Sequence, residues 1–165
     1  MTEQIFEVFW EGPYDWNGRG DPDALSAVHE NCVLYMICGT HVLYGRNVPL
    51  YIGRTERRLR ERLIEHDRDW IKYETDTVKI HAGYARRFIS WEGWPQNWTN
   101  HAENPPLPTK TVADIEKILI YSHFFAYNER AKKLNSPEVR NVRLFNTGRH
   151  STLLPEVSSL FYHGT

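Results

Sequence analysis

The feature that most limits how this chain can fold is a pair of short apolar runs separated by a turn. Residues 32–38, CVLYMIC, form a continuous apolar run of strand length, and residues 48–52, VPLYI, form a second run that ends at Gly53. The connection contains Gly39 and the triplet GRN at 45–47, which favours a turn. Two strand-length runs around such a connection predict a β-hairpin.

The segments after the hairpin predict two helices and a further strand region. Residues 57–70 contain neither glycine nor proline, and the hydroxyl of Thr55 is suited to cap a helix that begins there. Residues 77–81 and 84–89 alternate like strands, and a second, more apolar helix begins near Thr111. This order predicts an α+β fold, with a small central mixed or antiparallel sheet flanked by helices.

The length and the local composition suggest one core domain with two flanking segments. Residues 1–31 hold seven acidic residues and one basic residue, and we expect them to form an irregular arm with one short strand at residues 5–10. The core domain is expected over residues 32–130, with a tryptophan- and proline-rich insertion at 91–109. Residues 131–165 are expected to pack on the same domain as a C-terminal elaboration.

The composition also excludes several classes of protein. No apolar run approaches the roughly 18 residues of a membrane span, and the acidic N-terminus does not resemble a signal peptide, so we expect a cytoplasmic protein without a membrane partner. Two cysteines, Cys32 and Cys38, are too few for a zinc site. Residues 32–165 hold 19 basic and 14 acidic residues, a balance that favours a polyanionic partner without requiring one.

The stretch YIGRTERRLRERLIEH, at residues 51–66, carries five arginines within nine residues. Arg58, Arg62 and His66 are spaced four apart, so a helix would place them on one face. Guanidinium groups bind phosphate in a bidentate manner, and a histidine can orient a proton or accept one near neutral pH. The alternative interpretation of this stretch is a solvated helix face.

Four further residues can be interpreted in two ways when each is taken alone. Tyr35 and Tyr51 are ordinary strand residues or a pair of phenols on neighbouring strands. Glu116 lies in an otherwise apolar helix, so its carboxylate lies at the rim or is held by a metal or a base. Asn128 is either a helix cap or a member of a site.

These residues together resemble the GIY-YIG nuclease family over residues 32–130. The resemblance rests on LY at 34–35, YIG at 51–53, LRER at 59–62, His66, Glu116 and Asn128. The order of strands and helices expected above is also that of the family. The first motif departs from the family pattern, because VLY stands at residues 33–35 and sixteen positions separate the two tyrosines.

The resemblance implies a Mg²⁺- or Mn²⁺-dependent endodeoxyribonuclease that hydrolyses phosphodiester bonds. Glu116 would bind the metal, which prefers oxygen ligands and keeps several waters. One of Tyr35 and Tyr51 would help to remove the proton from the attacking water. We favour Tyr35 for this role, with His66 behind it, and we expect the metal, Arg62 or His66 to lower the pKa of the phenol.

The resemblance also assigns residues to the DNA substrate. Arg62 would neutralise the charge on phosphorus, and Asn128 would brace the site through hydrogen bonds. Gly53 would let the backbone approach closely, and Arg54 and Arg58 would contact phosphates. A further set of DNA-binding residues is the three tryptophans of the insertion, which would either stack on bases or pin the loop to the core: Trp91, Trp94 and Trp98.

The size of the chain leaves no room for a separate DNA-binding domain, which is typical of small restriction endonucleases of this family. We therefore expect a restriction or phage-defence nuclease that forms a homodimer. The alternatives are a nucleic-acid-binding module without activity, or with a preference for single strands or special structures, and a protein-interaction domain.

Overall fold

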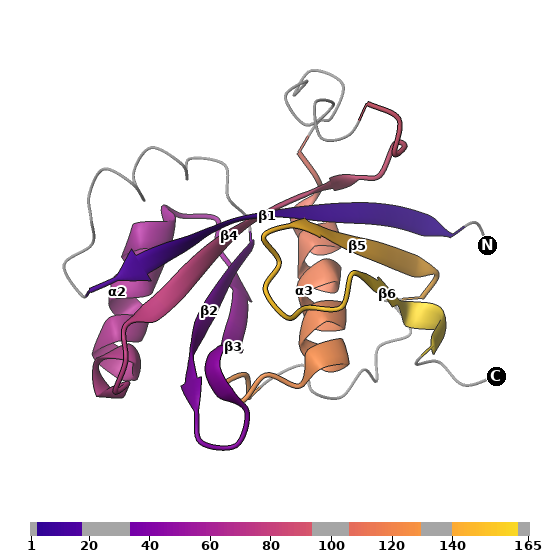
Figure 1. Cartoon of the computed structure of the whole chain (residues 1–165). Helices are drawn as coiled ribbons and strands as arrows, with labels where there is room; N and C mark the ends of the chain where they lie inside the picture. Colours follow the sequence, from indigo (N-terminus) through magenta and orange to yellow (C-terminus); the bar gives the residue numbers. More distant parts are fainter. Residues whose placement is uncertain (1–2, 18–33, 94–105, 130–139, 162–165) are drawn as a thin grey trace.

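The fold is built on one curled, six-stranded sheet, and the computed structural model describes residues 3–17, 34–93, 106–129 and 140–161 (Figure 1). The order of strands across the sheet is β3-β2-β4-β1-β5-β6. The strands are β1 (Gln4–Trp16), β2 (Leu34–His41), β3 (Gly45–Arg54), β4 (Val78–Arg87), β5 (Val142–Gly148) and β6 (Glu156–Ser158). The helices are α2 (Leu59–Asp69) and α3 (Thr109–His123), with short 3-10 helices η1 (Ile71–Tyr73) and η3 (Ser159–Phe161).

The expected α+β fold, with a small sheet flanked by helices, is wrong. Strands make up 42% of the described residues, the sheet curls into a half-barrel, and α2 and α3 are the only α-helices in this part of the chain (Figure 1). The difference arises at both ends of the chain. The segments expected to be an irregular arm and an elaboration contribute β1, β5 and β6, which double a sheet that would otherwise have three strands.

β1 is the longest strand and lies inside the sheet. It pairs antiparallel with β4 and parallel with β5, so the sheet is mixed. Phe6, Val8 and Trp10 are buried on one face, as the two-residue period of a strand requires. Glu7 is buried on the other face, where Arg86 lies 3.0 Å from its carboxylate. The buried ion pair explains how an acid-rich segment is accommodated in a sheet interior.

The hairpin of β2 and β3 sorts its side chains between two hydrophobic clusters, one on each face of the sheet. Leu34, Met36 and Cys38 belong to the cluster that includes α3. Tyr35 and Ile37 belong to the cluster that includes α2. The two helices therefore cover opposite faces of the sheet, and β3, an edge strand, is the place where residues from both helices can meet.

Several local boundaries differ from the sequence-based expectations. The pairing of His41 with Gly45 places the hairpin turn at residues 42–44, not at 45–47. Residues 78–87 form one strand instead of two, because this segment pairs along its whole length with β1. Thr55 does not cap α2; its hydroxyl bonds to the backbone of Arg57 instead.

α3 begins at Thr109, two residues before the expected start, and no side chain caps it. It ends at His123, and Phe124 follows in a left-handed conformation that closes the last turn. Neither α2 nor α3, nor any other helix in the described residues, has the length and apolar character of a bilayer span.

Candidate active site

A cleft with a volume of about 1070 Å³ lies along the edge strand β3, between α2 and α3. Six of the sequence-predicted site residues line it: Tyr51, Arg54, Arg62, His66, Glu116 and Asn128. Tyr35 lies directly beneath, because its hydroxyl is 2.8 Å from His66 Nε2. Residues that are more than 60 positions apart in the sequence therefore meet in one cleft, as the resemblance implied.

The hydrogen bonds around His66 fix its tautomer. The indole Nε1 of Trp70 donates to His66 Nδ1 over 3.2 Å, so Nδ1 carries no proton. The neutral ring then carries its proton on Nε2 and donates it to the hydroxyl oxygen of Tyr35. The Nε of Arg62 donates to the same oxygen over 3.3 Å. Tyr35 therefore accepts two hydrogen bonds. Its own proton is directed to a third partner, Tyr51.

The electrostatics of the site follow from burial. Burial lowers the pKa of His66 to about 4, and the charge of Arg62 acts in the same direction, so the imidazole is neutral near pH 7. Burial raises the pKa of Tyr35 above its ordinary value, Tyr51 raises it further, and Arg62 opposes both. The expected net lowering of the Tyr35 pKa by Arg62 and His66 is therefore absent, and the His66 tautomer suits an orienting donor.

Gly53 has a role that differs from the expected one. A Cβ atom at this position would lie 2.6 Å from Tyr35 Oη and 2.7 Å from Tyr51 Cε1. The centroids of the two tyrosine rings are 6.0 Å apart, and Gly53 is buried beneath them. The absence of a side chain therefore makes room for the two phenols, and the backbone here is not open to a substrate phosphate.

Glu116 projects from α3 into the cleft and is held by an arginine. Arg54 Nε lies 3.2 Å from Glu116 Oε2, and Arg54 also pairs with Glu56 over 3.1 Å. Burial raises the pKa of Glu116, whereas Arg54 and Lys117 lower it, so the guanidinium partly offsets the cost of burying the carboxylate.

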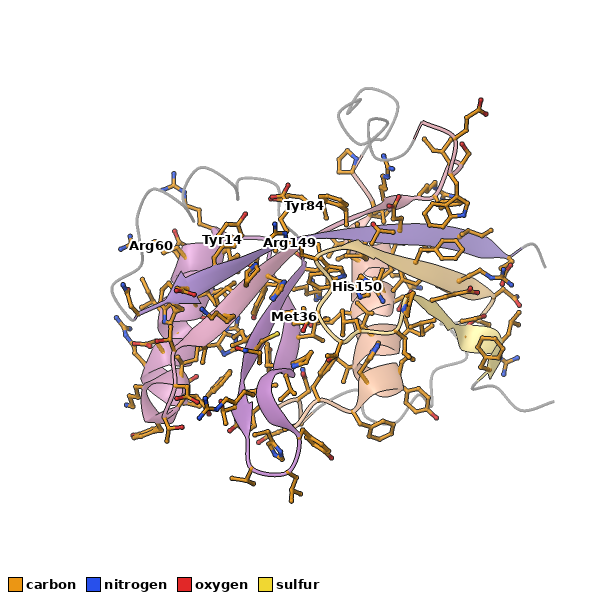
Figure 2. All side chains as sticks on the ribbon, viewed as in Figure 1. Tyr14, Met36, Arg60, Tyr84, Arg149 and His150 are labelled. Atoms are coloured by element: carbon orange, nitrogen blue, oxygen red, sulfur yellow. The ribbon has the colours of Figure 1, made fainter. Side chains whose placement is uncertain are left out.

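The arginines of the opening stretch are not all placed as expected. Arg57 lines the cleft, and both Arg57 and Arg62 pair with Glu65. Arg58 is exposed and is not part of the cleft lining, because it is the residue before α2 and helical spacing does not apply to it. Arg60 is also exposed, on the side of α2 that faces away from α3 (Figure 2).

Asn128 braces the edge of the sheet. Its Oδ1 accepts from the backbone N–H of Ile52 over 3.0 Å, and its Nδ2 donates to the Ile52 carbonyl over 2.8 Å. The N–H of the preceding residue, Tyr127, donates to the Leu50 carbonyl. These bonds satisfy backbone groups that an edge strand would otherwise leave unpaired. Asn128 is not a cap of α3, which ends five residues earlier at His123.

Trp91, the tryptophan of the insertion that the structure describes, is not part of the cleft lining. Trp91 is 51% exposed and packs on the rings of Phe88 and Phe145, at centroid distances of 4.7 and 5.0 Å. Trp94 and Trp98 lie outside the described residues. Among the lining residues that the sequence-based reasoning missed are Trp70, Lys117 and Tyr127. Only Tyr127 had a usable signal, since it directly precedes Asn128.

The cleft fits a weakly held divalent cation better than a tightly held one. Among the residues that the structure describes, no group of three or more histidines, cysteines, aspartates and glutamates is close enough to hold a metal. Glu116 offers a half-buried carboxylate, and Mg²⁺ commonly binds through one or two carboxylates, waters and substrate phosphates. The donor set is therefore compatible with Mg²⁺ or Mn²⁺ at Glu116, completed by water and a phosphate.

Comparison with known proteins gives no independent assignment of this cleft. The resemblance to the GIY-YIG family rests on the motif residues of the sequence alone. No protein-family model matches the sequence, and neither a curated protein nor a solved structure is significantly similar to it.

Proposed function

We propose that this protein is a metal-dependent DNA endonuclease of the GIY-YIG type that hydrolyses phosphodiester bonds. The observation that carries the proposal is the convergence of Tyr51, Arg62 and Glu116 on one cleft, with Tyr35 hydrogen-bonded beneath it. A phenol pair, a guanidinium and a carboxylate are the groups that hydrolysis of a phosphodiester needs, since charge grows on phosphorus while water loses a proton.

In this proposal Arg62 has two tasks. It faces the cleft, where a guanidinium stabilises the charge that develops on the phosphate, and it donates to Tyr35 Oη. The hydrogen bond and the charge of Arg62 stabilise the phenolate form of Tyr35 and so oppose the effect of burial on its pKa. Tyr35 is fully buried and does not line the cleft, so Tyr51, the phenol that does, is our candidate for accepting the proton from water, with Tyr35 hydrogen-bonded to Arg62 and His66 beneath it.

Glu116 and Arg54 form a second functional pair. Glu116 would hold the divalent cation, which supplies activation of water and stabilisation of the leaving oxygen when it is bound. If Glu116 held the cation, Arg54 would be able to turn from this carboxylate to a substrate phosphate. The chain therefore couples the acid of the site to an arginine that can bind substrate.

The test is a comparison of Glu116→Gln with Glu56→Gln. Both glutamates pair with Arg54, but the Glu56 side chain is 66% exposed and that of Glu116 is 20% exposed. We expect Glu116→Gln to abolish Mg²⁺-dependent cleavage while DNA affinity is retained, and Glu56→Gln to cleave like the wild type. Full cleavage by Glu116→Gln would refute the proposed role of this carboxylate.

The biological setting we propose is restriction or phage defence by a homodimer. Incubation with methylated and unmethylated plasmid, single-stranded DNA and RNA should give discrete fragments from one class of DNA, and light scattering should give twice the chain mass. A DNA-binding module without activity is the second candidate, because Arg54, Arg57 and Arg62 line the cleft and guanidinium groups can bind phosphate without a metal. Binding without cleavage in Mg²⁺ and in Mn²⁺ would favour it.

A further inference from the structure

Tyr127 lies at the rim of the cleft in a fixed orientation. Its N–H donates to the Leu50 carbonyl over 2.9 Å, and its hydroxyl donates to Glu74 Oε1 over 2.8 Å. Its ring contacts the ring of Trp70 edge to face, with centroids 4.8 Å apart and planes at 77°. Three contacts, one from β3 and two from the residues that flank η1, therefore hold one aromatic side chain.

This ring is held firmly and yet is not part of the core. Tyr127 is 37% exposed and lines the cleft, whereas the other phenol of the cleft lining, Tyr51, is largely covered. An immobilised aromatic ring with exposed surface loses little conformational entropy when a flat ligand stacks on it. The geometry is therefore that of a stacking platform.

The side chain of Trp70 connects Tyr127 to the residues of the proposed catalytic site. Trp70 contacts Tyr127 on one side, and its indole nitrogen donates to His66 on the other, which in turn bonds to Tyr35. The same cleft holds the arginines Arg54 and Arg62. An aromatic ring beside guanidinium groups offers complementary surfaces for the base and the phosphate of a nucleotide.

The volume of the cleft, about 1070 Å³, matches the upper end of small-molecule sites, which span roughly 300–1,000 Å³. It can enclose a nucleotide that has left the base stack. A base inside a continuous duplex has both faces covered by its neighbours and cannot stack on a protein ring.

We propose that Tyr127, braced by Trp70 and Glu74, stacks on an unstacked nucleobase next to the phosphate held in the cleft. This inference rests on the proposed nuclease function, and it names the substrate class as DNA with an exposed base. The base can come from single-stranded DNA or from a nucleotide extruded from a duplex, and the two sources share the same stacking chemistry.

The experiment measures binding in the Glu116→Gln background, so that no cleavage is needed. The probes are a single-stranded oligonucleotide and the matching duplex, each with 2-aminopurine at successive positions. The loss of one base stack corresponds to roughly 5- to 150-fold weaker binding. We expect Tyr127→Leu to weaken binding by this factor and to raise the 2-aminopurine fluorescence at one position of the bound probe.

Two matched variants complete the design. Tyr127→Phe keeps the ring but loses the hydrogen bond to Glu74, so it should weaken binding by less than Tyr127→Leu does. Tyr73→Leu removes a tyrosine that is 74% exposed and does not line the cleft, and it should have no effect. An effect of Tyr127→Leu on the single strand alone identifies single-stranded DNA as the source, and an effect on the duplex identifies an extruded base.

Unchanged affinity and fluorescence of both probes with Tyr127→Leu would overturn the stacking inference, even if the wild type cleaves DNA. If Tyr127→Leu weakens binding and raises the fluorescence, but the wild type never cleaves DNA with Mg²⁺ or Mn²⁺, the stacking inference is supported and the proposed nuclease function is refuted. The two failures are therefore distinguishable.

Discussion

The neutral state of His66 makes the stability of this protein sensitive to acid. The imidazole is 6% exposed, burial lowers its pKa from 6.5 to about 4, and both of its ring nitrogens are engaged in hydrogen bonds with neighbouring side chains. The unfolded chain takes up a proton as the pH falls below 6.5, whereas the folded protein does not until the pH nears 4. The stability present above pH 6.5 is therefore lost progressively between these two values.

The size of the effect follows from the two pKa values. A tenfold difference in proton affinity corresponds to about 1.4 kcal/mol. A pKa lowered from 6.5 to about 4 therefore limits the total loss of unfolding free energy to roughly 3 kcal/mol. At about pH 5 the expected loss from His66 is about 2 kcal/mol. Protonation would also break the bond from Trp70 to Nδ1, because a protonated ring has no acceptor there.

The assay is urea unfolding followed by tryptophan fluorescence, at about pH 7.5 and about pH 5. His66→Gln keeps an amide donor for Tyr35 and cannot titrate. We expect the free energy of unfolding of this variant to fall by about 2 kcal/mol less than that of the wild type between the two pH values. His41→Gln, at the hairpin turn, is the control and should behave like the wild type. Equal pH dependence in His66→Gln and the wild type would refute the argument.

Two further substitutions test how the site is built. Gly53→Ala places a Cβ within 2.7 Å of the rings of Tyr35 and Tyr51. We expect the free energy of unfolding to fall by about 1–3 kcal/mol, measured as a lower Tm. An unchanged Tm would show that the two tyrosines move aside without cost. Asn128→Ala leaves the N–H and C=O of Ile52 without their amide partner. We expect the free energy of unfolding, measured in urea, to fall by about 2 kcal/mol. A change near zero would mean that water replaces the amide.

The candidate site was more predictable from the sequence than the fold that carries it. Arg62 and His66 are both in the cleft lining because their spacing of four matches a helical turn. Tyr35 faces the α2 side because strand residues alternate. Such local periodicities need no knowledge of distant contacts. Arg58 was misplaced because the helix begins one residue later, and a helical projection fails outside the helix.

The rest of the fold depends on long-range contacts that local sequence patterns do not predict. Glu7 is an acid within a strand, and its pairing with Arg86 and with the hydroxyl of Thr147 offsets the cost of its burial. The partner residues lie far away in the sequence, so the acidic composition of residues 1–31 suggested an irregular arm. The role of Tyr127 as a held ring likewise depends on Trp70 and Glu74, which belong to another part of the chain.

The position of β1 between β4 and β5 constrains the order in which the chain can assemble. Residue 4 pairs with residue 142, and residue 6 pairs with residue 87, so β1 is synthesised well before either of the strands that flank it in the sheet. Contacts between residues this far apart slow folding and leave strand edges exposed in the nascent chain. Chaperone holding during translation is therefore expected to raise the yield of this protein.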